Sequence, residues 1–171
     1  MRKKIDHFKK APTFVAHLTI MSATFKFENS LGRILGVAHT AMFRHLGKLM
    51  KEQNLPITPE QFSVLSHLWQ KDGLQQSELA LCTNRNRANV TRIIDILERE
   101  GIVERKDDEN DRRVFRIHLT TKGKSLREVT AKCAEQSIKD SIKGLTKEEI
   151  ETCTKVLLKI QSNLKNKQVN A

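Results

Sequence analysis

The sequence of 171 residues contains no tyrosine, and aromatic side chains make up only 5% of it. Hydrophobic residues account for 38% and charged residues for 30%. This composition is typical of a charge-rich helical protein rather than of an all-β sandwich, which depends on aromatic and β-branched residues. The length is sufficient for one domain with a sizeable core. We therefore expect a single, mainly helical fold unit.

Cysteine is also scarce, and Cys82, Cys133 and Cys153 are odd in number and far apart. This pattern is typical of reduced thiols in a cytosolic protein rather than of a disulfide framework. No CxxC pair is present, and the six histidines are scattered without the spacing of metal ligands. We expect no metal site and no cofactor, and we expect Cys82, three residues after Leu79, to pack inside its helical motif.

No apolar run approaches the roughly 18 to 20 residues that a membrane-spanning helix needs. Residues 1–20 begin with basic residues and a short apolar stretch, but Pro12 and His17 interrupt that stretch, so we do not expect a secretory signal. A cytoplasmic location is the expectation. Residues 1–27 are expected to form a basic arm without regular structure, or to lie upstream of a start at Met21; contact of such an arm with DNA stays open.

The formal net charge of +11 and the isoelectric point near 9.8 favour polyanionic partners. Nucleic acid is the first candidate, and an anionic membrane surface is the second. The excess of positive charge lies toward the two ends of the chain, so it does not by itself locate a binding face.

Apolar residues recur at helical spacing from Leu31 to Leu49 and predict a long amphipathic helix that ends before Asn54. A second helix is predicted to begin at Thr58. Thr58 can cap its free amides, Pro59 suits the first helical position, and Gln61 completes a capping box.

Two closely spaced helices follow. The first has Leu79 and Ala80 on its inner face, a polar turn spans residues 83–85, and the second runs over residues 86–100 until Gly101 stops it. Two helices joined by so short a turn predict a helix-turn-helix.

Residues 102–106 and 114–119 are predicted to form two short strands that flank a highly charged tip at residues 107–113. A β-hairpin behind a helix-turn-helix is a wing. The predicted fold is therefore mainly α with a small β-hairpin wing.

After Thr120 and Thr121, either of which can cap a helix, the chain is expected to be helical with a break at Gly144. A second capping box starts at Thr146. The last helix carries apolar residues at alternating spacings of three and four, which is a heptad seam that favours another helix as partner. Packing of this seam within one chain is the alternative. Its members are Ile150, Cys153, Leu157, Ile160 and Leu164.

Four strings between Glu78 and Gly123 resemble the MarR (multiple antibiotic resistance regulator) family of winged-helix proteins. They are Glu78-Leu79-Ala80, the run from Val90 to Arg105, Asp111-Arg112-Arg113, and Leu119-Thr120-Thr121-Lys122-Gly123. The resemblance covers about residues 28–165. It implies a dimerisation helix over 28–56, a winged helix-turn-helix over 57–120 and further dimerisation helices over 121–171.

The resemblance implies that the helix over 86–100 enters the major groove of DNA and that the wing reaches the adjacent minor groove. The helix exposes side chains that suit phosphates and purine edges, where arginine commonly reads guanine and asparagine reads adenine. The expected DNA contacts are Arg85, Arg87, Asn89, Thr91 and Arg92 on the helix and Arg112 and Arg113 on the wing, with Asp111 orienting an arginine through a salt bridge.

Three positions depart from the family's usual pattern. Asn84 replaces a glycine that is frequent in the turn, Thr83 replaces an apolar residue, and Glu109 replaces a proline of the wing. Asparagine tolerates the left-handed backbone conformation, so the first change is mild. Thr83 leaves the helix register open, and Glu109 leaves the loop shape open.

The resemblance also implies a homodimer on a palindromic site and release of DNA by a small aromatic or phenolic molecule. Dimer contacts are expected at Leu31, Leu35, Ile150, Leu157, Ile160 and Leu164. Aromatic candidates for an effector pocket are His39, Phe43, Phe62, His67 and Trp69, with ordinary core packing as the alternative. Some relatives sense oxidants through a cysteine near the start of the first long helix, and no cysteine lies there.

The sequence therefore predicts a DNA-binding transcription regulator, most simply a repressor. The alternative is a winged-helix protein-interaction module that binds nucleic acid without sequence preference. No nucleophile-base pair or phosphate loop supports an enzyme.

Overall fold

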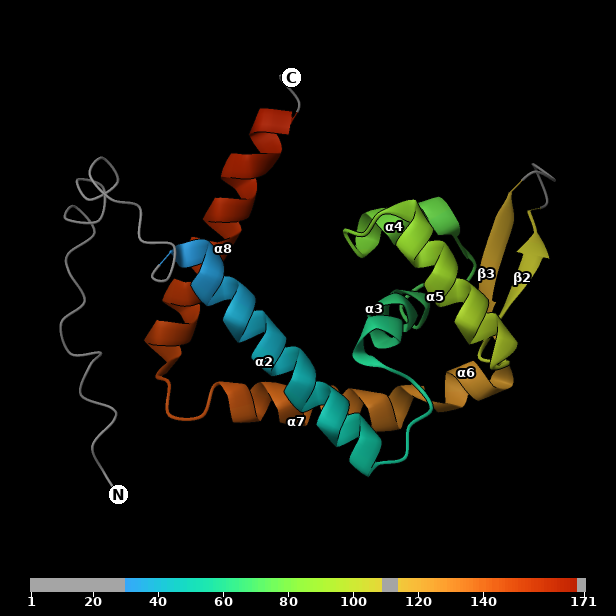
Figure 1. Cartoon of the computed structure of the whole chain (residues 1–171), viewed down its shortest axis with the longest axis horizontal. Coiled ribbons are helices and arrows are strands. Elements are labelled where there is room, and N and C mark those ends of the chain that lie inside the picture. The colour runs from blue at the N-terminus through green and yellow to red at the C-terminus, as the bar shows by residue number, and fades with distance from the viewer. Residues whose placement is uncertain (1–29, 109–113, 169–171) are drawn as a thin grey trace. The chain divides into compact units, whose positions relative to one another are not determined.

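In a computed structural model, the structure describes residues 30–108 and 114–168, with side chains to residue 164 (Figure 1). It confirms a mainly helical chain. The elements in order are α2 (Leu31–Glu52), α3 (Pro59–Leu68), β1 (Leu74–Gln75), α4 (Gln76–Cys82), α5 (Arg87–Arg99), β2 (Val103–Asp107), β3 (Phe115–Leu119), α6 (Thr121–Ser125), α7 (Arg127–Ser141) and α8 (Lys147–Gln168).

Contacts within the chain define two compact units, residues 1–41 and 42–171. The first unit contains the start of α2, where Leu31, Ile34 and Val37 are more than half exposed. The second contains the remainder of α2 and every later element. The division into dimerisation and DNA-binding segments at residues 56 and 120 stays a prediction.

The predicted caps explain where the helices begin. The Thr58 hydroxyl accepts a hydrogen bond from the Gln61 amide, while Gln61 Oε1 accepts one from the Thr58 amide at 2.7 Å. Thr146 and Glu149 form the same reciprocal pair before α8. Of the two threonines considered before α6, Thr120 is the cap, because its hydroxyl accepts from the amide of Gly123. The two capping boxes are short-range signals that the sequence alone reveals, whereas the choice of Thr120 over Thr121 needs the structure.

The turn between α4 and α5 accommodates both unusual residues. Asn84 has a φ of 51°, which is the left-handed conformation that asparagine tolerates. The Thr83 hydroxyl donates to the main-chain oxygen of Leu79 at 2.7 Å, so this C-cap residue is accommodated without an apolar side chain. The helix register left open by Thr83 is thereby resolved.

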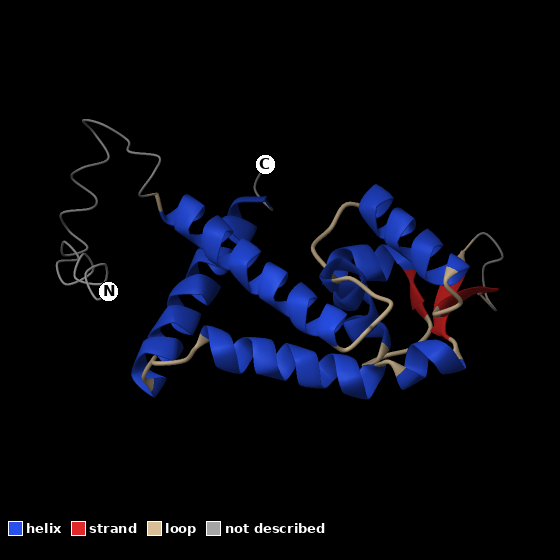
Figure 2. Cartoon of the chain, turned by 60° about the horizontal axis from the view of Figure 1, so that its bottom comes forward, coloured by secondary structure: helices blue, strands red, loops and turns tan. Residues whose placement is uncertain are grey.

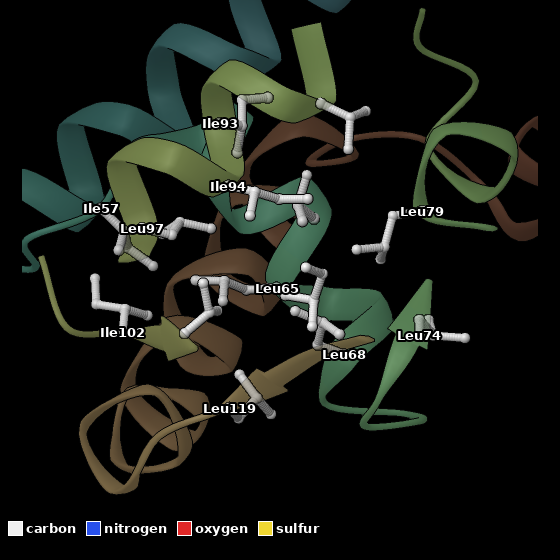
Figure 3. Close-up of a cluster of buried hydrophobic side chains, with 14 of the residues drawn as sticks. Ile57, Leu65, Leu68, Leu74, Leu79, Ile93, Ile94, Leu97, Ile102 and Leu119 are labelled. Carbon is white, nitrogen blue, oxygen red and sulfur yellow. The ribbon is translucent and has the colours of Figure 1, made fainter. Parts of the chain in front are cut away.

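One core joins α3, α4, α5 and the sheet. Figure 3 shows Leu65 and Leu68 of α3 converging with Ile94 and Leu97 of α5. Leu65, Ile94 and Leu97 have no exposed surface. Because α5 is anchored by this buried side, its opposite face is held outward.

The sheet has three strands rather than the two of the predicted hairpin. β3 lies between β2 and β1, and Leu74 of β1 pairs with Ile117 in antiparallel register (Figure 2). The sequence did not predict β1, because a strand of two residues is too short to show a recognisable alternation. The added strand fastens the base of the wing to the turn before α4.

The prediction that Cys82 is buried is wrong. This residue was expected to pack inside the helix-turn-helix, but its side chain is exposed. Leu79 and Ala80 are buried as predicted, and the rotation of α4 then carries Leu81 and Cys82 to the outside.

Candidate nucleic-acid interface

The N-terminal half of α5 presents polar side chains on the side away from the core. Arg87, Asn89 and Arg92 are exposed, and Thr91 is half-buried. Arg85, predicted to lie on the same helix, instead precedes the Asn86 cap in the turn before α5 and is half-buried. The helix has no acidic residue in its first turn. The buried side that fixes this orientation consists of Val90, Ile93, Ile94 and Leu97.

Arg85, Arg87 and Arg92 form no side-chain hydrogen bond or ion pair among the residues that the structure describes. The side-chain amide of Asn89 likewise has no such partner in that part of the chain. Asn86 differs, because its Oδ1 caps α5 by accepting from the Asn89 amide at 2.8 Å. The uncommitted donors are therefore three guanidinium groups and one amide, which suit phosphates and base edges.

A hollow of about 440 Å³ lies beside the start of α5. It brings Arg85 and Arg87 together with the end of α4. Its lining consists of Ser77, Ala80, Leu81, Asn84, Arg85, Asn86 and Arg87. The positive end of a helix and two arginines make this surface attractive to anions.

Among the predicted contacts that the structure describes, Thr91 is the one whose polar group is already bonded. Its hydroxyl donates to the main-chain oxygen of Arg87 at 2.8 Å and accepts from Nε2 of Gln76 at 2.5 Å. Gln76, the first residue of α4, was not among the predicted site residues. No sequence signal identifies it, because it lies 15 residues from Thr91 and meets it only in the folded motif.

The two acidic residues of α5, Asp95 and Glu98, face the wing and share one arginine. Arg105 of β2 contacts Asp95 at 2.6 Å and also pairs with Glu98. The main-chain amide of Arg105 donates to Glu98 Oε1 at 3.1 Å. Partial burial opposes the charged form, but the two carboxylates outweigh it and raise the pKa of Arg105. These bonds fix the wing strand against the recognition helix.

A second set of polar contacts fixes the other side of the wing. Arg116 of β3 donates through Nε to buried Asp108 at 2.5 Å and through Nη1 to the main-chain oxygen of Gly73 at 2.9 Å. Asp72 Oδ1 accepts from the main-chain amide of Leu119 at 2.9 Å. The predicted wing residues Asp111, Arg112 and Arg113, and Glu109 with them, lie outside the described residues.

The predicted pocket residues are brought together only in part. The ring centroids of Phe62 and Trp69 are 6.2 Å apart, and both rings pack against the core. Trp69 Nε1 also donates to the main-chain oxygen of Gly123 at 3.0 Å. His67 is half-buried on the same helix, α3, and Phe43 is half-buried on α2. His39 belongs to the other unit.

A second hollow, of about 390 Å³, lies where α2 turns into α3. None of the five aromatic candidates lines it or the hollow beside α5. Its lining consists of Gly47, Lys51, Asn54, Leu55, Ile57, Thr58 and Pro59. The effector pocket stays a prediction.

The predicted dimer residues retain exposed apolar surface in the single chain. Leu31 is 54% exposed, Leu157 39% and Leu164 61%, while Leu35, Ile150 and Ile160 are half-buried. Their part in a dimer is a prediction that these exposures leave open.

Two negative findings apply to residues 30–108 and 114–168. No helix in those segments is long and apolar enough to cross a membrane. No group of three or more histidine, cysteine or acidic side chains within them is arranged to hold a metal ion.

The chain is similar in sequence to known transcriptional regulators. The sequence profile of the MarR family matches residues 57–115. The chain is 30% identical over 130 residues to the uncharacterised HTH-type transcriptional regulator YsmB of Bacillus subtilis, covering 72% of this chain and 89% of YsmB. It is also 30% identical over 132 residues to the transcriptional repressor MprA of Escherichia coli, covering 75% of this chain and 74% of MprA.

The fold is similar to a solved structure of Bordetella bronchiseptica BpsR, whose DNA binding is regulated by 6-hydroxynicotinic acid. The TM-score is 0.74 at 23% identity, covering 81% of this chain and 97% of BpsR. That likeness shows that the two proteins share a fold. The helix-turn-helix, its attached sheet and the two relatives at 30% identity together establish that the chain belongs to the MarR family of DNA-binding transcriptional regulators, which are not enzymes.

Proposed function

We propose that this chain binds a palindromic duplex operator as a homodimer and represses transcription until a small molecule releases it. The observation that carries the proposal is the surface of α5. Arg87, Asn89 and Arg92 are exposed and uncommitted, the first turn of α5 has no acidic residue, and Asp95 and Glu98 are paired with Arg105. Such a face offers hydrogen-bond donors to the major groove.

In this proposal Arg87 and Asn89 contact base edges, while Arg85 and Arg92 contact phosphates. The wing enters the adjacent minor groove through Arg112 and Arg113, with Asp111 orienting one of them. Two arrangements support a rigid wing, namely the contacts of Arg105 with α5 and those of Arg116 with Gly73. A rigid wing reaches the minor groove without a large loss of conformational entropy.

A homodimer explains the apolar surface of α8. A second copy would bury the seam from Ile150 to Leu164 together with Leu31 and Leu35 of α2. A twofold axis would place the two recognition helices about one DNA turn apart, roughly 34 to 36 Å. The operator is then expected to be a palindrome.

Repression and effector release rest on relatives. MprA is named a repressor, and BpsR responds to 6-hydroxynicotinic acid. By analogy we propose an aromatic acid or phenol that contacts some of His39, Phe43, Phe62, His67 and Trp69. Because Trp69 is the only tryptophan, its fluorescence reports on binding near it.

The test is a fluorescence-anisotropy titration of the full chain with the duplex upstream of its own gene. Binding is compared with random duplex at about 50 mM and about 200 mM salt, because phosphate contacts make affinity fall steeply with salt. Arg87→Ala and Asn89→Ala should each cost about 1–3 kcal/mol of specific binding. Arg113→Ala tests the wing. Arg99→Ala, which removes an exposed arginine at the other end of α5, is the matched control.

Equal affinity for the upstream and random duplexes, unchanged in all these variants, would overturn the proposal. It would favour the alternative hypothesis of a winged-helix protein-interaction module. Effector release is tested separately by titrating 6-hydroxynicotinic acid into the complex while following Trp69 fluorescence. Loss of the complex with a change in fluorescence supports the proposed pocket. Loss without that change places the effector elsewhere.

A further inference from the structure

The Thr91 hydroxyl differs from the other polar groups of the recognition surface because it is bonded in two directions. Its single hydrogen is directed to the Arg87 main-chain oxygen, and one lone pair receives Nε2 of Gln76. A threonine hydroxyl has one hydrogen and two lone pairs. Thr91 therefore has no hydrogen left to donate to a base.

The bond from Gln76 connects the two helices of the motif. Gln76 begins α4, Thr91 lies in the second turn of α5, and both side chains are half-buried. Arg87, Asn89 and Arg92 on the same surface have no such support. The two helices thus fix one side chain of the surface, while its described neighbours Arg87, Asn89 and Arg92 keep their side-chain donors available.

Because the hydroxyl of Thr91 is bonded in two directions, its methyl group is the part of the side chain that remains for contact with DNA. An apolar contact between a threonine methyl and the C5-methyl of thymine is one of the ways in which proteins read the major groove. It needs a fixed side chain, because a methyl group in the wrong rotamer faces elsewhere. The bonds of the Thr91 hydroxyl to Gln76 and to the Arg87 main chain together supply this fixation.

We propose that Gln76 is a positioning residue of the DNA interface, and that it holds Thr91 so that its methyl group contacts the C5-methyl of a thymine in each half-site. The inference rests on the proposed function, since it requires α5 to enter the major groove. It names a base preference and assigns it to a methyl group rather than to a hydroxyl.

The experiment begins by selecting preferred duplexes from a random pool with the full chain. Each thymine of the selected site is then replaced by deoxyuridine, symmetrically in both half-sites, which removes only the C5-methyl. Burying a methyl-sized group is worth roughly fourfold in affinity, so loss from two half-sites should weaken wild-type binding about fifteenfold at one position. Competition anisotropy measures the thymine-to-uracil ratio.

Four variants separate the methyl from the hydroxyl. Thr91→Ser keeps the hydroxyl and should lower the ratio to about one. Thr91→Val keeps the methyl and has a stiff rotamer, so it should retain the wild-type ratio. Gln76→Met removes the amide and should lower the ratio, and Gln76→Met with Thr91→Val should restore it. Thermal melting of each variant confirms that the fold is intact.

The restored ratio in the double variant is the decisive result, because a general loss of structure at Gln76 would not be rescued at Thr91. A thymine-to-uracil ratio in Thr91→Ser equal to that of the wild type overturns the inference. So does a selected site in which no thymine shows the uracil effect, or a ratio of one in Thr91→Val. Failure to select any preferred duplex instead overturns the proposed function itself.

Discussion

The recognition helix α5 and the last helix α8 are both amphipathic, but they use their apolar residues differently. α5 buries four apolar side chains within its own chain. None of the described side chains of α8, residues 147–164, is buried, and Leu158 and Leu164 are 60% and 61% exposed. The comparison shows that an apolar stripe predicts a helix and a need for burial, while the partner that provides the burial has to come from the structure.

The chain therefore has a core that is complete within one copy and, on α8, an apolar seam that is exposed in one copy. Buried side chains of α2, α3, α4, α5, α7 and the sheet share one core, which holds the exposed polar face of α5 in place within a single chain. On α8, apolar side chains contact water until something covers them. Substitutions in the core and in the α8 seam test this difference, and the largest effect is expected in the core.

The largest effect is expected from Leu97, which has no exposed surface and faces the centre of the core. Leu97→Ala should lower the free energy of unfolding by about 2–5 kcal/mol, because it leaves a cavity. Leu158→Ala on α8 should change it by less than about 0.5 kcal/mol in dilute solution. Urea denaturation followed by circular dichroism measures both. Equal losses would show that α8 is covered within its own chain.

A smaller loss is expected at Gly123, where α6 approaches Ile102, just before β2. A Cβ atom there would lie 2.1 Å from the main-chain oxygen of Ile102, so Gly123→Ala forces a shift of backbone. We expect a loss of about 1–3 kcal/mol. The control is Gly36→Ala in α2, where no atom lies within 4 Å and the helix should gain about 0.5–1 kcal/mol. A harmless Gly123→Ala would contradict the close approach.

The role of the α8 seam in self-association is tested by adding a charged side chain to it. Leu157→Glu places a carboxylate in the seam and should weaken self-association at least tenfold, about 1.4 kcal/mol, since burying an unpaired charge is costly. Ser162→Glu adds the same charge to the same helix off the seam and should leave association unchanged. Sedimentation equilibrium measures both. An unaffected dimer in Leu157→Glu would place the interface on other residues.

The features that the sequence predicted well are those fixed by short-range physics. The capping box at Thr58, the left-handed Asn84 and the buried side of α5 depend on residues within a few positions of each other. The likeness to the MarR family then supplied the arrangement of the motif. Thr120 could be distinguished from Thr121 as a cap only from the hydrogen bond itself.

The features that the sequence missed depend on residues far apart in the chain. β1 becomes a strand only because Leu74 pairs with Ile117, and Gln76 gains its role only by meeting Thr91. Cys82 was placed inside because it follows Leu79 at helical spacing. In the folded chain α4 buries Leu79 and Ala80, and Leu81 and Cys82 are exposed, so the spacing misled.

The smallest effect concerns thiol reactivity, and it distinguishes the two regions without a change of fold. Cys133 is 5% exposed, and burial raises the pKa of its thiol, so it should stay protonated and react slowly with a thiolate-specific reagent at neutral pH. Cys82 is exposed at the end of α4, and Cys153 is exposed in the α8 seam. In dilute solution both should be labelled rapidly.

Raising the protein concentration should slow the labelling of Cys153 alone, because a second copy would cover the seam but not the end of α4. The rate at Cys82 is the internal control, measured in the same sample by mass spectrometry of the digested peptides. In Leu157→Glu the rate at Cys153 should no longer depend on concentration. If Cys153 reacts equally fast at all concentrations while sedimentation shows a dimer, the seam remains open in that dimer. The apolar face of α8 would then serve a different partner from the one proposed.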